Sequence, residues 1–124
     1  MTILIEKKNV YSSYFLVYIF CIKLEWDEYK NQLNKQNHHV SFETALYVFA
    51  DPFRLERYDR SENNNRLEDT FQTIGKVGDI LFVVYTERAD SYRIISARLA
   101  DAEERRLYYG NSKKRNSDWR PANI

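Results

Sequence analysis

The chain has 124 residues, of which 44% are apolar and 30% are charged, a composition typical of one globular domain and not of a disordered chain. Its formal net charge of +1 excludes a protein that attracts nucleic acid over its whole surface. The charge is uneven, because residues 1–86 carry a net −2 and residues 87–124 a net +3. A polyanionic partner is therefore expected on the C-terminal third.

The first 22 residues stand apart from the rest. Their apolar run, from Tyr14 to Ile22, is too short to span a bilayer, which takes about 20 residues. The bulky Ile19 and Phe20 argue against a signal-peptide cleavage site. We expect an additional strand or a loosely attached arm here; a wrongly chosen start codon is an alternative, and membrane insertion is a third.

The helical part of the chain follows a strand predicted over residues 21–26, CIKLEW. Asp27 is a suitable N-cap for a helix that continues to Gln36, with Tyr29 and Leu33 on one face.

A second helix is predicted after Ser41, a good N-cap. Asp51 and Pro52 end it. Its apolar residues recur at helical spacing and predict a stripe that faces the core, formed by Phe42, Ala45, Leu46 and Phe49.

Strands dominate the region that follows. Gly75 and Gly78 are expected to bracket a turn between two of them. The most apolar run, ILFVVYT, predicts the central strand, and SYRIISAR is expected to return antiparallel to it. Strands are predicted over residues 53–58, 70–75, 80–86 and 91–98, with a polar loop over residues 59–69.

The last helix is predicted to begin after Asp101, with Glu104 completing a capping box, and to end at Gly110. The order of elements predicts an α+β domain, a small antiparallel sheet with two N-terminal helices and one C-terminal helix. We assign residues 1–22 to an N-terminal extension, 23–110 to the domain and 111–124 to a basic polar tail that is expected to be disordered.

No metal-binding or cofactor-binding pattern is recognisable. One cysteine excludes an intrachain disulfide and, with two histidines, argues against structural zinc, and it points to the cytoplasm. The Arg, Lys, His and Tyr residues around the predicted sheet suit metal-independent RNA cleavage. That reaction needs a base for the 2′-hydroxyl, cations for the phosphorane charge and an acid for the leaving oxygen.

The geometry of a regular strand limits what the two arginines of the run YRIISAR can bind together. Arg93 and Arg98 point to opposite faces of a regular strand and lie about 16 Å apart. They cannot both hold one phosphate unless the strand contains a bulge. Arg105 and Arg106, on the last helix, are explained as surface pairs with the acidic residues Asp101 and Glu103.

Several stretches in this order resemble the BrnT family of ribonuclease toxins. They are LEWDEYKNQLNKQNHHVSFETALYVFADP, FQTIG, LFVVYTER and RIISARLADAEERRLYY, and the resemblance covers about residues 23–109. It implies a RelE-like fold, toxicity through RNA cleavage, and inhibited translation. The implied partner is a BrnA-like antitoxin with a ribbon-helix-helix part, through which alone the complex contacts operator DNA. No membrane partner is implied.

The resemblance also implies site residues. Arg98, at the end of a strand, corresponds to an arginine that acts on the phosphate in RelE-like toxins. His38 and Lys30 match a histidine and a lysine of the family pattern, and are assigned to proton transfer or backbone contact. The residues assigned to RNA binding are Arg88, Arg93, Tyr108 and Tyr109.

The chain departs from the family pattern at three positions. Asn37 and His39 replace a lysine and a glycine on either side of His38, and Thr70 replaces a common arginine. Arg66 is a nearby substitute for that arginine. The departures leave open a rival interpretation, a non-enzymatic module that binds the antitoxin, contributes to operon regulation and cleaves nothing.

Overall fold

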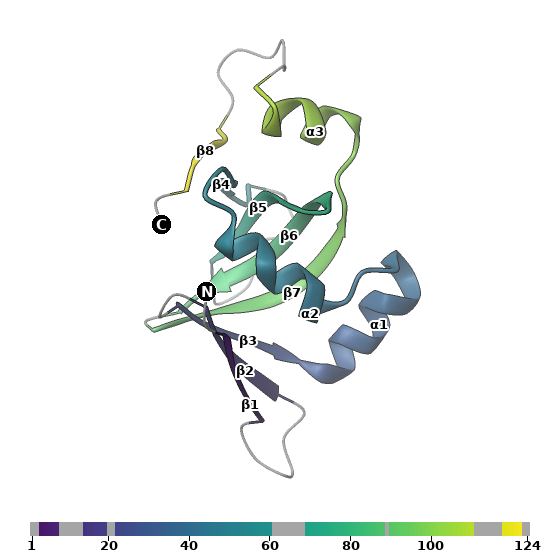
Figure 1. Ribbon diagram of the computed structural model, residues 1–124, viewed down its shortest axis with the longest axis vertical. Helices are drawn as coiled ribbons and strands as arrows, with labels where there is room; N and C mark the ends of the chain where they lie inside the picture. The colour runs from purple at the N-terminus through teal and green to yellow at the C-terminus, as the bar shows by residue number, and fades with distance from the viewer. Residues whose placement is uncertain are drawn as a thin grey trace.

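The computed structural model describes residues 3–7, 14–19, 22–60, 69–88, 90–110 and 118–122, with side chains from residue 23 onward. Its strands form one sheet in the order β1-β2-β3-β7-β6-β5-β4-β8 (Figure 1). The strands are β1 (Ile3–Lys7), β2 (Tyr14–Ile19), β3 (Ile22–Asp27), β4 (Leu55–Tyr58), β5 (Thr70–Val77), β6 (Asp79–Glu87), β7 (Ser91–Leu99) and β8 (Arg120–Pro121). Neighbouring strands are antiparallel, except that β3 and β7 run parallel.

Helices cover both faces of this sheet. The two short helices α2 (Phe42–Ala45) and η1 (Leu46–Ala50), the latter a 3₁₀ helix, follow α1 (Glu28–His38), and α3 (Ala102–Tyr108) comes after the last long strand. Odd-numbered residues of β6 pack with α2 and η1, and even-numbered ones with α3 and Trp119. We call these the α2 face and the α3 face. The predicted α+β class, with two N-terminal helical segments and one C-terminal helix, is confirmed.

The predicted helix caps are also confirmed. The Asp27 side chain accepts a hydrogen bond from the backbone N–H of Tyr29, and Ser41 caps α2 through Thr44. Asp101 and Glu104 form the complete capping box of α3. These caps satisfy backbone N–H groups that have no partner within the helix, and so fix where each helix begins.

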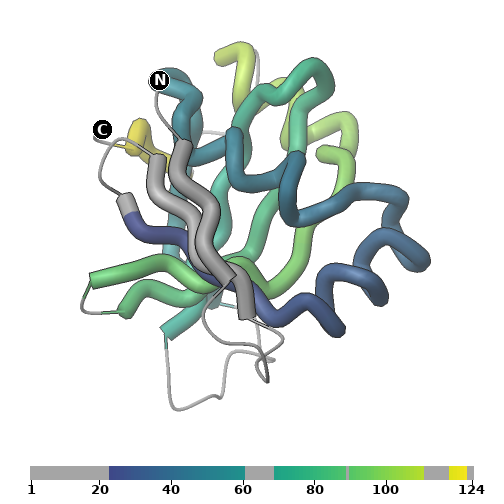
Figure 2. Tube along the Cα trace, turned by 60° about the horizontal axis from the view of Figure 1, so that its bottom comes forward, coloured from purple at the N-terminus to yellow at the C-terminus, as the bar shows by residue number. Residues whose placement is uncertain are grey.

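The stripe expected on the second helix is buried in the core. Figure 2 shows the chain from α1 through α2 and η1 crossing in front of the central strands. Leu24 and Trp26 of β3 join the same cluster, and Trp26 meets Phe42 edge to face with ring centroids 6.4 Å apart. All four predicted stripe residues belong to it, namely Phe42, Ala45, Leu46 and Phe49.

Helix α1 packs against the sheet through polar residues. Tyr29 and Leu33 are exposed, and the residues that α1 buries are Asn31 and Asn34. The Asn34 amide donates to the carbonyls of Val40 (2.8 Å) and Ala97 (2.7 Å) and accepts from the Ala97 N–H (3.1 Å). A buried polar side chain is stable where its hydrogen bonds are satisfied, so amides take the place that an apolar stripe would otherwise hold.

The glycine prediction holds at one position. Gly78, between β5 and β6, has a φ of 70° that glycine adopts without strain. Gly75 instead lies within β5, where an added Cβ would be 2.6 Å from Cγ1 of Val48. Gly75 is therefore required for the close approach of η1 to the sheet and not for a turn.

Strand β7 is not regular, and this changes where its arginines point. The register with β6 shifts between Val84, which pairs with Ser96, and Tyr85, which pairs with Ile94, leaving Ile95 as an extra residue. Such a bulge reverses the alternation of side chains. Arg93 and Arg98 consequently share the α3 face, instead of lying on opposite faces. Their partners on β6, four residues apart, place them about 13 Å from each other.

The two ends of the chain add to the sheet. β1 and β2 form an antiparallel pair, and β2 pairs with β3. At the other end, the expectation of a disordered tail is wrong for residues 118–122, because β8 pairs with β4 and Trp119 packs against Phe82. Residues 111–117 of the tail and 61–68 of the predicted loop lie outside the described residues.

Candidate functional site

Two polar contacts hold the inner side of α3 against the rest of the domain. Glu104, in its first turn, binds Arg98 at the end of β7. Tyr108, one turn later, donates to Asp51, which follows η1. Glu104 and Tyr108 are four residues apart, about 6 Å along the axis, so the two contacts lie on the same side of α3.

Arg98 is held in a fixed orientation. Its Nη1 and Nη2 donate to the two oxygens of Glu104 at 2.7 and 2.9 Å, and Nη1 also donates to the Leu99 carbonyl. The guanidinium lies 4.0 Å above the Phe82 ring. The hydrogen bonds to the Glu104 carboxylate raise the pKa of Arg98 above its ordinary value. The group is thus a permanent cation.

One edge of the Arg98 guanidinium remains open. A guanidinium has five N–H donors, and Glu104 and Leu99 accept from three of them. Among the described residues, none accepts a hydrogen bond from the edge formed by Nε and the second Nη2 proton. The side chain is 37% exposed. An Nε–Nη2 edge matches two oxygens of a phosphate, so Arg98 is suited to bind one while Glu104 orients it.

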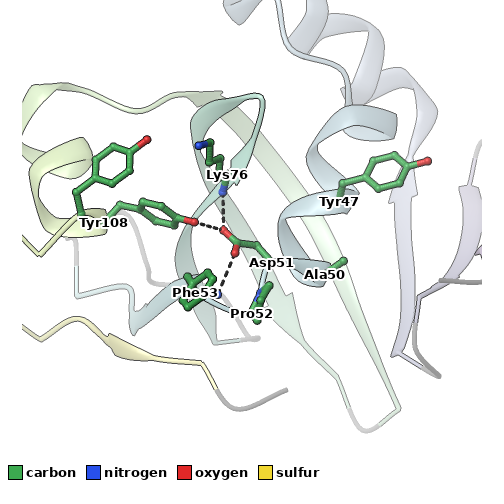
Figure 3. A pocket seen from close by; sticks show the side chains of 8 residues that line it. Tyr47, Ala50, Asp51, Pro52, Phe53, Lys76 and Tyr108 are labelled. Carbon is green, nitrogen blue, oxygen red and sulfur yellow. Dashed lines mark hydrogen bonds between the residues drawn. The ribbon is translucent and has the colours of Figure 1, made fainter.

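Asp51 forms the floor of a pocket beside α3 (Figure 3). Its Oδ1 accepts from the backbone N–H of Phe53 (2.9 Å), and its Oδ2 accepts from the backbone N–H of Lys76 (2.8 Å) and from the Tyr108 hydroxyl (2.6 Å). Burial, together with this carboxylate, raises the pKa of Tyr108 well above its ordinary value. The pocket has a volume of about 690 Å³ and is lined by Tyr47, Ala50, Asp51, Pro52, Phe53, Lys76, Tyr108 and Tyr109.

Replacing Tyr108 by Phe is expected to lower the free energy of unfolding by about 1.5–3 kcal/mol, because a hydrogen bond to a charged group is lost while the ring is kept. Urea denaturation should show a lower midpoint at an unchanged slope. Tyr109→Phe, on the exposed neighbour, should change the stability by less than about 0.5 kcal/mol. Equal stability of Tyr108→Phe and the native chain would contradict the tie to Asp51.

The stabilisation by the Tyr108–Asp51 hydrogen bond should decrease at high pH. An unfolded tyrosine titrates near 10.0, and the folded-state pKa of Tyr108 is higher. The stabilisation is therefore fully present below pH 10 and is lost as the pH rises through the raised folded value.

Arg93 and Arg88 converge on a buried carboxylate. Arg93 contacts Oε1 of Glu25 from Nη2 at 3.2 Å, and Arg88 Nε lies 3.8 Å from the same atom. Glu25 and Arg93 are register partners of the parallel pair β3–β7. The two arginines thus stabilise this end of the α3 face, and both side chains keep part of their surface exposed.

Lys30 and His38 are exposed on α1. Helix α1 contacts β7 through Asn34 and Ala97 on the α2 face, whereas Arg98 lies on the α3 face. No contact in the described residues joins Lys30 or His38 to Arg98. The structure therefore does not assemble the three predicted catalytic side chains into one cluster.

The surface arginines of α3 behave in two ways. Arg106 pairs with Glu103 at 3.0 Å, as expected from their spacing. Arg105 does not pair with Asp101, whose side chain caps the helix, and instead donates to the Ala100 carbonyl at 2.8 Å. Neither of them reaches the pocket or Arg98.

The family comparison applies to this same region. The model of "Ribonuclease toxin, BrnT, of type II toxin-antitoxin system" matches residues 26–104, from the last residues of β3 into α3. The chain belongs to the BrnT family. As a member of a type II toxin–antitoxin family it has an antitoxin as its implied partner.

One solved BrnT is similar to this chain. The 1.1 Å crystal structure of the Brucella abortus ribonuclease toxin BrnT is 20% identical, with a TM-score of 0.44, over 61% of this chain and 92% of that chain. No curated protein matches the chain.

Two of the departures from the BrnT pattern have local explanations. His39 has a φ of 60°, the left-handed conformation in which the glycine of the pattern is favoured, and it ends α1. Thr70 is buried and donates to the buried carboxylate of Asp59 at 3.1 Å. Thr70, the first residue of β5, therefore holds the start of β5 to the segment that follows β4.

Sequence reasoning missed most of the pocket. The sequence predicts Asp51 only as the end of a helix, although its side chain accepts hydrogen bonds that connect the end of η1 to β5 and α3. The sequence predicts Phe53 at the start of a strand and gives no signal at Lys76. Among the described residues, no group of three His, Cys, Asp or Glu side chains is placed to hold a metal ion, and no helix is long and apolar enough to cross a membrane.

Proposed function

We propose that the chain is a metal-independent endoribonuclease that inhibits translation by cleaving RNA. The observation that carries the proposal is the match to the BrnT ribonuclease-toxin model over residues 26–104. The proposed substrate places its action in the cytoplasm.

The geometry of Arg98 supports a role at the phosphate. Its open guanidinium edge offers two parallel N–H donors, and the Glu104 carboxylate restrains it before substrate arrives. A cation that is already oriented stabilises a phosphorane-like transition state without reorganising. Glu104 acts through Arg98 and is a positioning residue.

The remaining predicted residues are assigned around this cation. Arg93, on the same face about 13 Å away, and Arg88 beside it would bind the RNA backbone, with Tyr108 and Tyr109 on the α3 side. His38 and Lys30 would transfer protons or contact the backbone from α1. Because α1 packs on the α2 face, this assignment requires the RNA to pass around the end of β7.

The proposed partner is a BrnA-like antitoxin with a ribbon-helix-helix part. It would occlude the toxin and bring the complex to operator DNA. The uneven charge of the chain supports contact of the RNA with the C-terminal third.

Synthesis of this chain without its antitoxin is expected to stop growth and protein synthesis. Purified protein should cleave RNA in the presence of EDTA and leave a 2′,3′-cyclic phosphate, because the 2′-hydroxyl is the nucleophile. Incorporation of labelled amino acid and analysis of the RNA ends measure the two results.

Two outcomes would contradict this proposal in different ways. Normal growth, with soluble and folded protein present, would favour the non-enzymatic antitoxin-binding module. Cleavage that EDTA abolishes would overturn the metal-independent mechanism.

A further inference from the structure

The pocket beside α3 displays aromatic rings that remain substantially exposed to solvent. Phe53 is 74% exposed, Tyr109 55% and Tyr47 40%. They come from three separate segments, the turn after η1, the end of α3, and η1 itself. Figure 3 shows Tyr108 and Tyr47 on either side of Asp51, with Phe53 beside it. Exposed rings around a concave site are a feature of ligand recognition and add no core stability.

The charge at the pocket suits an anionic chain. The one acidic side chain that lines it, Asp51, is buried, and the three hydrogen bonds that it accepts compensate part of its negative charge. Lys76 lines the same pocket with an exposed side chain. The three hydrogen bonds also fix the turn that carries Phe53, so the pocket is formed before ligand binds.

We infer that this pocket binds one unpaired nucleobase of single-stranded RNA, with Lys76 on the neighbouring phosphate. The inference rests on the proposed ribonuclease function and adds a base-binding subsite to it. Every base has a flat π-face that stacks on Phe, Tyr or Trp, and recognition of single strands depends on such stacking. The volume of about 690 Å³ lies within the range of sites that hold molecules of nucleotide size.

The position of the pocket connects the base to the proposed chemistry. Tyr108, which lines it, is one helical turn from Glu104, and Glu104 holds Arg98. A nucleotide whose base lies in the pocket would thus have its backbone on the side of α3 where Glu104 holds Arg98. The base-binding subsite would determine which phosphate of the RNA binds to Arg98.

Binding of a labelled single-stranded 2′-O-methyl oligoribonucleotide, which lacks the nucleophilic 2′-hydroxyl, tests the inference. Phe53→Ala is expected to weaken binding about 5- to 100-fold. Phe53→Trp, which keeps an aromatic ring at this position, should bind the oligoribonucleotide with the affinity of the native chain. The matched control is Tyr29→Ala, an equally exposed aromatic on α1, 68% exposed, which should change the affinity less than twofold.

Abasic substitutions at each position of the oligoribonucleotide identify the base. One position should weaken binding to the native chain and have no further effect on Phe53→Ala. Lys76→Gln should lower the affinity for all sequences and reduce its salt dependence.

The outcomes separate this inference from the proposed function. RNA cleavage by the native chain, with Phe53→Ala binding like Tyr29→Ala, would overturn the pocket and leave the function standing. A folded native chain that neither binds nor cleaves RNA would overturn both. Loss of antitoxin binding by Phe53→Ala at unchanged RNA affinity would show a protein interface and overturn the base-binding subsite.

Discussion

Arg98→Ala is expected to lower the rate of RNA cleavage by about 100- to 1,000-fold, the usual effect of removing one preorganised donor from a transition state. The reason is structural, because Arg98 is a fixed cation with an open edge at the end of β7. Single-turnover cleavage of a defined RNA, with protein in excess, measures the chemical step.

The fold must be measured in the same variant. Arg98 lies against Phe82 and satisfies Glu104, which is buried, so its removal is expected to cost about 1.5–3 kcal/mol of stability. Comparing rates below the melting range of each variant separates activity from folding.

Two matched variants make the result specific. Glu104→Gln keeps the shape and the capping role but removes the charge that orients Arg98, so it should lower the cleavage rate less than Arg98→Ala. Arg106→Ala should change the rate less than about threefold, because an exposed helix pair contributes only ~0.2–0.5 kcal/mol. Equal losses in Arg98→Ala and Arg106→Ala would indicate a diffuse RNA-binding surface instead.

Asn34→Ala is expected to destabilise the protein by roughly 3 kcal/mol, and by more if no water enters the site. The Asn34 amide forms hydrogen bonds with the Val40 carbonyl and with both the carbonyl and the N–H of Ala97, and all these groups are buried. A buried group left without its hydrogen bond costs about 1–3 kcal/mol. For a domain of this size the melting temperature should fall by roughly 10–15 °C, measured by calorimetry.

The control for this variant lies on the same helix. Asn37 is exposed, and Asn37→Ala should shift the stability by less than about 0.5 kcal/mol. A similar melting temperature for both alanine variants would show that the Asn34 network does not hold α1 to β7.

Local signals in the sequence were sufficient for much of the fold. Caps at Asp27, Ser41 and Asp101 act within three residues, and the stripe through Phe42 depends only on helical spacing, so these features were predicted correctly. The central position of β6 followed from its continuous apolar run.

The features that local signals in the sequence do not indicate are long-range. The inward face of α1 is polar because the groups that satisfy Asn34 lie 63 residues away on β7. The extra residue Ile95 reverses the side-chain alternation of β7, and no residue type marks such a bulge. The pocket likewise combines Asp51, Lys76 and Tyr108, whose proximity depends on the completed sheet.

The parallel pairing of β3 with β7 delays the completion of the sheet during synthesis. β3 and α1 leave the ribosome early, but their partners on β7 come much later in the chain, and such distant contacts form slowly. Arg98, Glu104 and Tyr108 follow later still. A nascent chain that ends before β7 would thus carry β3 and α1 without the residues proposed to act on RNA.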